Sequence, residues 1–289
     1  MPRRRKPAHA GTFYPATRGE LLKSIEDSFT HPLGPGRLPL EKFTGGRGVG
    51  YIVPHAGYMY SGPVAAHAYL RLARERRPDV VVIAGPNHGM VGLGAAVYKD
   101  GLWETPLGDV EVDSEVSRLI VGYSRFFGFD EAAHVYEHSV EVQVPFLQYI
   151  YGGDLRIVPI TVGLQTLEVS RDLGEAVARV IMDNGVDVVF IASSDFNHYE
   201  PHEVTVRKDM EAINAILGMD EELMYRVIES ANITMCGPSP VAALIHLAKR
   251  VKGGKPVLLK HATSGDVTGD KSWVVGYASI EFPREENQG

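Results

Sequence analysis

Short runs of apolar, often β-branched residues recur along the chain, and longer amphipathic segments separate them. Several of the runs are apolar at successive positions, which is typical of strands that are covered on both faces of a sheet. The runs that we predict to be strands are Val49–Val53, Asp79–Ala84, Gly94–Tyr98, Leu155–Val162, Val186–Ala192, Val257–His261 and Trp273–Glu281.

The segments between these runs carry the periodicity and the end signals of helices. Thr17 and Glu20 form a capping box before the first helix, and Pro63 lies where it can open the second. Gly185 is a C-terminal stop signal for a later helix. The predicted helices after the first are Val64–Arg77, Asp113–Gly122, Ser139–Ile150, Leu167–Asn184, Pro201–Leu217, Glu221–Glu229 and Ser239–Val251.

Strands that alternate with helices predict an α/β fold with three layers. A central, largely parallel or mixed β-sheet would be flanked by helices, and the C-terminal strands could add antiparallel edges. No linker divides the chain, because the Gly/Pro-rich stretch 31–50 lies too near the N-terminus to separate two cores. We therefore expect a single domain over residues 1–289, with residues 1–8 as a flexible arm.

The charge balance and the apolar content exclude some classes of partner. The chain has 29 basic and 36 acidic residues, and this formal net charge of −7 argues against binding to the phosphates of nucleic acid. The basic run 3–6 is interpreted as part of the solvated arm. No stretch approaches the ~18 consecutive apolar residues of a membrane-spanning helix. Cys236 is the only cysteine, which excludes an intrachain disulfide and makes the cytoplasm the expected compartment.

Three predicted strands are each followed at once by a turn that carries a histidine. These histidines are His55, His88 and His198. In open α/β sheets, ligands bind beyond the carboxyl ends of the strands, so the three side chains can converge although they lie far apart in sequence. Neutral imidazole is both a metal ligand and a proton shuttle near pH 7. The pattern therefore predicts a shared site at one edge of the sheet.

Further candidates lie near the same turns, and each has a simpler alternative. Asp195 could fix the tautomer of His198 or form an Asx-turn and a helix cap. Cys236 precedes a predicted helix, whose dipole would lower the pKa of the thiol, or it is a small buried apolar residue. His138 begins an apolar helix and could aim at the same cleft, or its neighbours could serve only to cap that helix.

Six segments of the sequence together resemble the Memo family, which is also described as the AmmeMemoRadiSam system protein B. The resemblance covers essentially the whole chain and indicates an archaeal member. The segments are Ala10–Pro15 (AGTFYP), Pro54–Gly62 (PHAGYMYSG), Gly85–His88 (GPNH), Glu137–Glu141 (EHSVE), Ser193–Tyr199 (SSDFNHY) and Met235–Gly237 (MCG).

The resemblance implies a fold similar to that of the class III extradiol dioxygenases, which are non-haem iron enzymes. Transferred motif by motif, it implies a metal site and an adjacent catalytic pocket. The implied metal ligands are His55, His88 and Cys236, and the implied catalytic residues are His198 as acid or base, Asp195 and His138.

The implied cofactor is Fe(II), with copper or zinc as alternatives. Ring-cleaving enzymes of that fold hold iron with two histidines and a carboxylate, whereas this chain offers the thiolate of Cys236, a soft ligand that also suits copper and zinc. The implied function is a redox or dioxygenase-like enzyme that acts on a small substrate. The alternatives are a zinc-dependent hydrolase with His198 as general base, and a non-catalytic protein whose pocket binds a small molecule or a peptide. The family name also implies association with radical-SAM and AMMECR-type proteins.

Overall fold

Four parallel strands form the centre of the sheet in the computed structural model, which describes residues 3–39 and 48–285. Alternate residues of these strands enter different cores, as Val81 and Val82 do. Burial on both faces explains why the sequences are apolar at successive positions. The order of the central strands is β8 (Arg156–Val162), β3 (Val80–Pro86), β9 (Val188–Ser193) and β2 (Gly48–Val53).

Shorter and antiparallel strands extend this centre on both sides into one mixed sheet. β12 runs antiparallel to β2, and β11 and β10 both pair with β12. On the other side β6 lies beside β8, followed by β5 and β1, while β4 and β7 form a branch from β8. The additional strands are β1 (Arg4–Arg5), β4 (Ala95–Val97), β5 (Gly101–Thr105), β6 (Gly108–Val112), β7 (Gly128–Phe129), β10 (His198–Glu200), β11 (Val257–Thr263) and β12 (Val274–Pro283).

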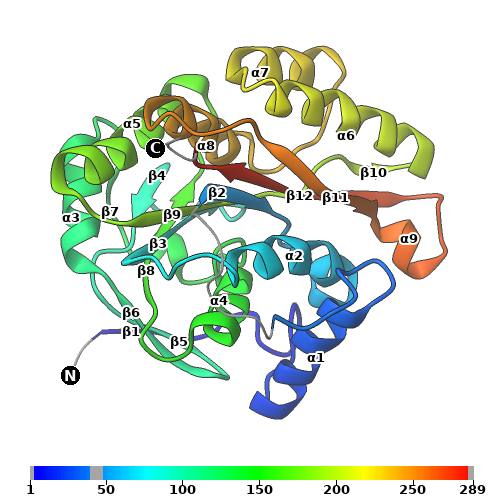
Figure 1. Cartoon of the computed structure of the whole chain (residues 1–289), viewed down its shortest axis with the longest axis horizontal. Coiled ribbons are helices and arrows are strands. Elements are labelled where there is room, and N and C mark those ends of the chain that lie inside the picture. The colour runs from blue at the N-terminus through cyan, green and yellow to red at the C-terminus, as the bar shows by residue number, and fades with distance from the viewer. Residues whose placement is uncertain (1–2, 40–47, 286–289) are drawn as a thin grey trace.

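Helices cover the two faces of the sheet and complete the three layers. One core contains residues of α3, α5, α6, α7 and α8, and the other contains residues of α1, α2 and α4. Figure 1 shows α6 and α7 above the sheet and α1 and α2 below it. The predicted single α/β domain is therefore confirmed. The helices are α1 (Arg18–Thr30), α2 (Tyr58–Leu72), α3 (Ser114–Tyr123), α4 (Val144–Tyr151), α5 (Leu167–Asn184), α6 (His202–Leu217), α7 (Glu221–Ser230), α8 (Pro238–Arg250) and α9 (Ser264–Thr268). Within the described ranges, no helix has the length and apolar character needed to cross a membrane.

Two predicted helix starts are wrong. α2 begins at Tyr58 rather than after Pro63, which lies inside the helix; Gly57 is the N-cap. The segment from Ser139 does not begin as an α-helix. A short 3₁₀ turn over Glu141–Gln143 comes first, and the Glu141 carboxylate accepts the backbone N–H of His9 instead of capping a helix.

The expectation of a flexible arm is wrong for Arg4 and Arg5. These two residues form β1, which pairs in parallel with β5. The Arg4 guanidinium bonds to Asp109, whereas that of Arg5 is buried and lies 4.3 Å from the ring centre of Trp103. The basic run is therefore divided between the surface and the interior, because a guanidinium that is saturated with hydrogen bonds can be buried.

Gly185 ends α5 in the left-handed conformation, with φ of 68°, as its predicted role as a stop signal requires. Gly185→Ala is expected to cost about 1–2 kcal/mol in the free energy of unfolding, because a Cβ at this position is strained although no atom lies within 4 Å of it. Chemical denaturation measures the effect. Gly122→Ala inside α3 is the control, and it should be neutral or stabilising; a loss of the same size there would contradict the explanation.

Candidate metal centre

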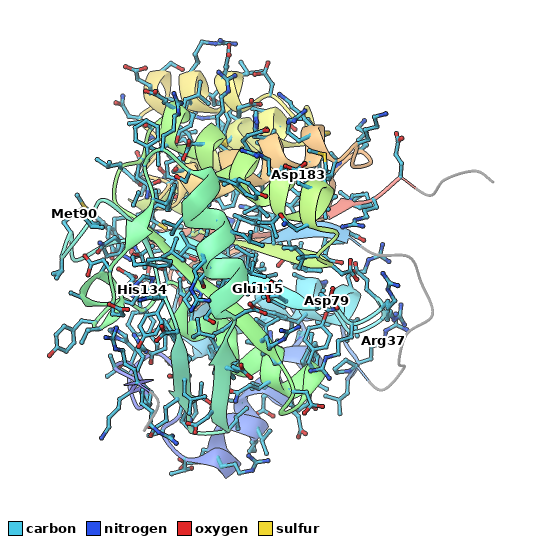
Figure 2. The ribbon with its side chains drawn as sticks, turned by 90° about the vertical axis from the view of Figure 1, so that its left-hand side faces the viewer. Arg37, Asp79, Met90, Glu115, His134 and Asp183 are labelled. Carbon is cyan, nitrogen blue, oxygen red and sulfur yellow. The ribbon has the colours of Figure 1, made fainter. Side chains whose placement is uncertain are left out.

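The turns that carry the predicted histidines lie at one edge of the sheet. Asp79 precedes β3 and Met90 follows it, and Figure 2 shows these two residues on opposite sides of the molecule. His88 lies between β3 and Met90, while His55 follows β2 and His198 follows β9. Because these strands are parallel, their carboxyl ends meet at the same edge. All three turns therefore lie at one edge of the sheet, as predicted.

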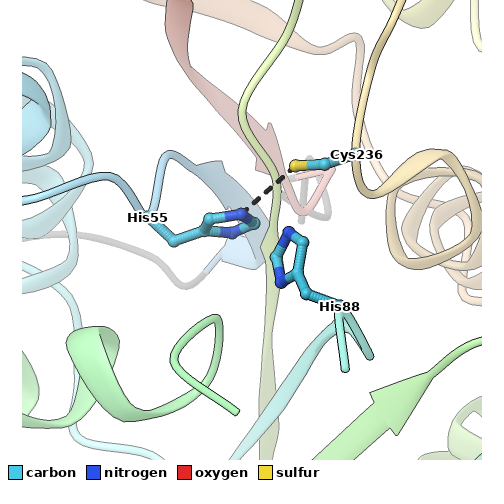
Figure 3. Close-up of side chains that lie close together, drawn as sticks. All are labelled: His55, His88 and Cys236. Atoms are coloured by element: carbon cyan, nitrogen blue, oxygen red, sulfur yellow. Dashed lines mark hydrogen bonds between the residues drawn. The ribbon is translucent and has the colours of Figure 1, made fainter. Parts of the chain in front are cut away.

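His55, His88 and Cys236 point toward one another at this edge (Figure 3). One ring nitrogen of each histidine and the sulfur of Cys236 lie within 4.8 Å of one another. The two rings are nearly perpendicular, at 86°, with their centres 5.3 Å apart. Cys236 Sγ lies 3.2 Å from His55 Nε2, although 181 positions separate the two residues. The fold thus brings together the three residues expected to bind a metal.

The surroundings of His55 determine which of its ring nitrogens carries a proton. Ser193 Oγ donates its only proton to the carbonyl oxygen of Ser139, at 2.6 Å, and so it can only accept the bond from His55 Nδ1, at 2.9 Å. Burial, and then the neighbouring His88, lower the pKa of His55 well below its usual range, so the ring is neutral at pH 7. Nδ1 therefore carries the proton, and Nε2 presents a lone pair to Cys236.

Glu137 fixes the same tautomer in His88. One carboxylate oxygen accepts the Nδ1 proton at 2.9 Å, and the other accepts the backbone N–H of His88 at 2.6 Å. Burial alone would raise the pKa of Glu137, but hydrogen bonds from His88 and Ser139 outweigh it and lower the pKa to about 2. A carboxylate that orients a metal-ligating histidine is common in metal sites. We did not single out this role from the sequence, although Glu137 lies within the EHSVE motif.

The sulfur of Cys236 is placed to bind a metal ion, with loss of the thiol proton. In the neutral state its S–H donates to the Nε2 lone pair of His55, and its sulfur accepts the N–H of Asp195 at 3.2 Å. The expectation that the start of α8 lowers the pKa of the thiol is wrong. Loss of hydration, and then the carboxylate of Asp195, raise that pKa well above its usual range. A metal cation in place of the S–H proton would reverse this effect, because a coordinating thiol is deprotonated.

Asp195 is buried beside the three ligands, but it does not hold the ring of His198. Its Oδ1 accepts the backbone N–H of His55 at 2.8 Å, and burial raises the pKa of its carboxyl. The ring of His198 is held by Thr234, whose carbonyl oxygen lies 2.8 Å from Nδ1. A carbonyl only accepts, so Nδ1 of the neutral ring donates and Nε2 keeps its lone pair. The predicted Asp195–His198 partnership is thus corrected, and Thr234, like Glu137, is a residue that the sequence reasoning missed.

His138 lies in the same cleft, packed between two other rings. Its ring stacks on His88, with centres 4.4 Å apart, and lies tilted by 32° against Phe13, with centres 4.3 Å apart. Burial, and then the nearby His55, lower its pKa to about 3, so it is neutral at pH 7. His9 also contacts His138, with ring centres 5.5 Å apart. No local sequence signal had distinguished His9, because its contact depends on the path of the N-terminal segment.

This arrangement fits a transition-metal ion. The described residues contribute two imidazole lone pairs and one sulfur from the protein. Ligands at about 2.0 Å for nitrogen and 2.3 Å for sulfur in a tetrahedral geometry lie about 3.5 Å apart, so the 3.2 Å between His55 Nε2 and Cys236 Sγ would have to lengthen only slightly to admit an ion. Three protein ligands leave a position for water or substrate. His198, with its free Nε2, could move a proton.

A solved structure shares the fold at low sequence identity. The crystal structure of an uncharacterized protein from Escherichia coli K12 aligns with a TM-score of 0.53 and 13% identity, over 81% of this chain and 99% of that one. This likeness concerns the fold alone. The expected similarity to class III extradiol dioxygenases stays a prediction.

Sequence relatives are much closer. Residues 5–281 match the family described as "Memo-like protein". A "MEMO1 family protein" of Aeropyrum pernix is 57% identical over 96% of this chain and 98% of its own length. Proteins of the same name from Pyrobaculum arsenaticum and Desulfurococcus amylolyticus are 53% and 50% identical, each over 97% of this chain and 99% of the relative. With matches that extend over nearly all of both sequences, the chain belongs to the family of Memo-like proteins.

Proposed function

We propose that this protein binds one transition-metal ion through His55, His88 and Cys236, and that it is a non-haem iron enzyme of redox or dioxygenase-like type acting on a small substrate. The observation that supports the metal site is the common tautomer of its two imidazoles. Each gives its Nδ1 proton to a buried acceptor, Ser193 or Glu137, and so keeps Nε2 for a cation. Metal ligands of this kind normally have such partners.

Fe(II) is the proposed metal, and bound iron would supply the electron and oxygen chemistry that the side chains lack. The residues of the chain hold and orient the site. Asp195 joins two ligands, because its carboxylate accepts the N–H of His55 and its own N–H bonds to the sulfur of Cys236. His198, held by Thr234, would accept or return a substrate proton at Nε2.

A zinc-dependent hydrolase is the second candidate, and the thiolate favours it. Sulfur replaces the carboxylate that iron dioxygenases of the implied fold use, and imidazole with thiolate is a common ligand set for zinc. His198 would then act as general base toward a water molecule. Anaerobic titration with Fe(II) and with Zn(II), followed by oxygen uptake with a panel of catechols, distinguishes the candidates. Binding of one metal without any turnover would favour the non-catalytic alternative, and no metal binding would contradict the proposal.

His198→Ala separates proton transfer from metal binding. The variant is expected to keep its metal affinity within a few fold of the wild type, because His198 is not a proposed ligand, and to lose turnover. In Asp195→Asn the turnover should fall about 10–100-fold, which is the range typical of groups that orient a ligand. His202→Ala is the matched control, since the ring of His202 bonds to Thr263. Loss of metal binding in His198→Ala would show that His198 is a ligand. Full turnover in His198→Ala would show that another residue transfers the proton.

A further inference from the structure

The guanidinium of Arg5 is buried beside the loop that carries Glu137 and His138. Its Nε and Nη2 atoms donate to the carbonyl oxygen of His134, at 3.0 and 2.9 Å, and Nη2 also donates to that of Glu137 at 2.9 Å. Nη1 is paired with the carboxylate of Glu141, which is fully buried. Arg5 thus contacts both ends of the loop 134–141.

Glu141 ties the N-terminal segment to this loop. Besides the Arg5 side chain, its carboxylate accepts the backbone N–H groups of Ala8 and His9, at 3.0 and 2.8 Å, and the hydroxyl of Tyr14 at 2.6 Å. All these donors lie between residues 5 and 14. The N-terminal segment is therefore fixed in a position from which His9 contacts the ring of His138.

A short chain of contacts connects Arg5 with a proposed metal ligand. Arg5 holds the backbone carbonyl of Glu137, and the carboxylate of Glu137 holds both the backbone N–H and the Nδ1 proton of His88. Arg5 and His88 are thus linked by hydrogen bonds through one intervening residue, Glu137. Any shift of the loop changes the distance between the carboxylate and the imidazole, and that hydrogen bond decides which nitrogen of His88 carries the proton.

We propose that Arg5 is a positioning residue of the metal centre, which fixes Glu137 so that His88 presents Nε2 to the ion. This inference rests on the proposed function where it concerns the metal, but the effect on His88 is defined without one. The planar fork of arginine is needed, because several donors must reach carbonyl and carboxylate groups at once. A lysine could pair with Glu141 but could not also hold the carbonyls of His134 and Glu137.

Arg5→Lys tests this role because it retains the positive charge opposite Glu141. Nitrogen NMR of ¹⁵N-histidine-labelled, metal-free protein reports the tautomer of His88. We expect one tautomer in the wild type and a mixture in Arg5→Lys. Titration with Zn(II) alone should show an affinity about 10–100-fold lower than that of the wild type, the range for losing the support of a ligand. Arg4→Lys is the matched control, because Arg4 is the neighbouring arginine and pairs with Asp109 at the surface.

The two readouts decide between positioning and a merely structural role. If folded Arg5→Lys has a lower melting temperature but the wild-type His88 tautomer and Zn(II) affinity, the proposal is wrong. If Arg5→Lys does not fold, the double variant Arg5→Gln/Glu141→Gln removes both buried charges together and is judged by the same two measurements. If the wild type binds no Zn(II) or Fe(II), the proposed function fails, while the His88 tautomer still decides the role of Arg5.

Discussion

Replacement of Cys236 by serine is expected to abolish tight metal binding, with a loss well beyond the roughly 10–100-fold that follows removal of a group that only orients a ligand. The substitution removes a ligand and its charge together. The sulfur lies 3.2 Å from His55 Nε2 and is held by the N–H of Asp195. A serine hydroxyl in the same place would not ionise near neutral pH and is a harder ligand, so the two imidazoles alone would have to retain the ion.

Anaerobic competition titrations with Fe(II) and Zn(II) measure this loss, because thiolate–iron sites oxidise in air. Met235→Leu is the matched control, since it removes the neighbouring buried sulfur without touching the proposed ligand set. We expect Met235→Leu to bind one ion with the wild-type affinity. Equal binding by the wild type and Cys236→Ser would remove Cys236 from the ligand set, and it would leave the role of the two histidines to be tested separately.

Acid is expected to destabilise the protein through His134, by about 3 kcal/mol between pH 6.5 and pH 4. Burial of the ring lowers its pKa from 6.5 to about 4, although the hydrogen bond from Nδ1 to the carbonyl oxygen of Asp130 opposes this change. Below pH 6.5 His134 becomes protonated in the unfolded chain, whereas in the folded chain it stays neutral until the pH falls to about 4. The contribution to stability is therefore complete above pH 6.5 and is lost as the pH falls; each unit between the two pKa values corresponds to ~1.4 kcal/mol.

Denaturant unfolding at several pH values checks this expectation. Other buried histidines add to the loss, so the informative quantity is the difference between the wild type and His134→Asn, in which an amide replaces the Nδ1 donor without an ionisable group. This variant should lose less stability on acidification than the wild type. His31→Asn, at the end of α1, is the control and should follow the wild type. Parallel pH profiles for His134→Asn and the wild type would show that His134 does not carry the effect.

The positions of His55 and His88 could be predicted because strand burial and strand direction are encoded locally. An apolar run such as Val80–Ala84 must lie inside the sheet, and the residue that follows it must then lie at the edge. Cys236 does not follow a strand, and only the MCG motif connected it with the two histidines. The sequence pattern thus predicted that the two histidines lie at one edge of the sheet, and the resemblance to a family added Cys236 as the third ligand.

The partners of these residues could not be predicted, because they depend on which of several polar groups lies nearest after packing. Asp195 is three positions from His198, and yet its carboxylate bonds to the N–H of His55, while the ring of His198 bonds to Thr234. The burial of Arg5 likewise depends on a partner that only packing brings near. A basic run at a terminus is usually solvated, and only the buried carboxylate of Glu141, 136 positions away, explains why this guanidinium lies inside.

The wide spacing of the three ligands along the chain has a consequence for synthesis on the ribosome. His55 and His88 are made early, but the thiol that completes the set is made only with residue 236, and β12, which covers the edge of β2, follows later still. Before that point a nascent chain would offer only the two imidazoles of the proposed ligand set, which do not distinguish well among the divalent metals of the first transition row. Selection of the metal by the complete proposed set would therefore begin only after residue 236 has been made.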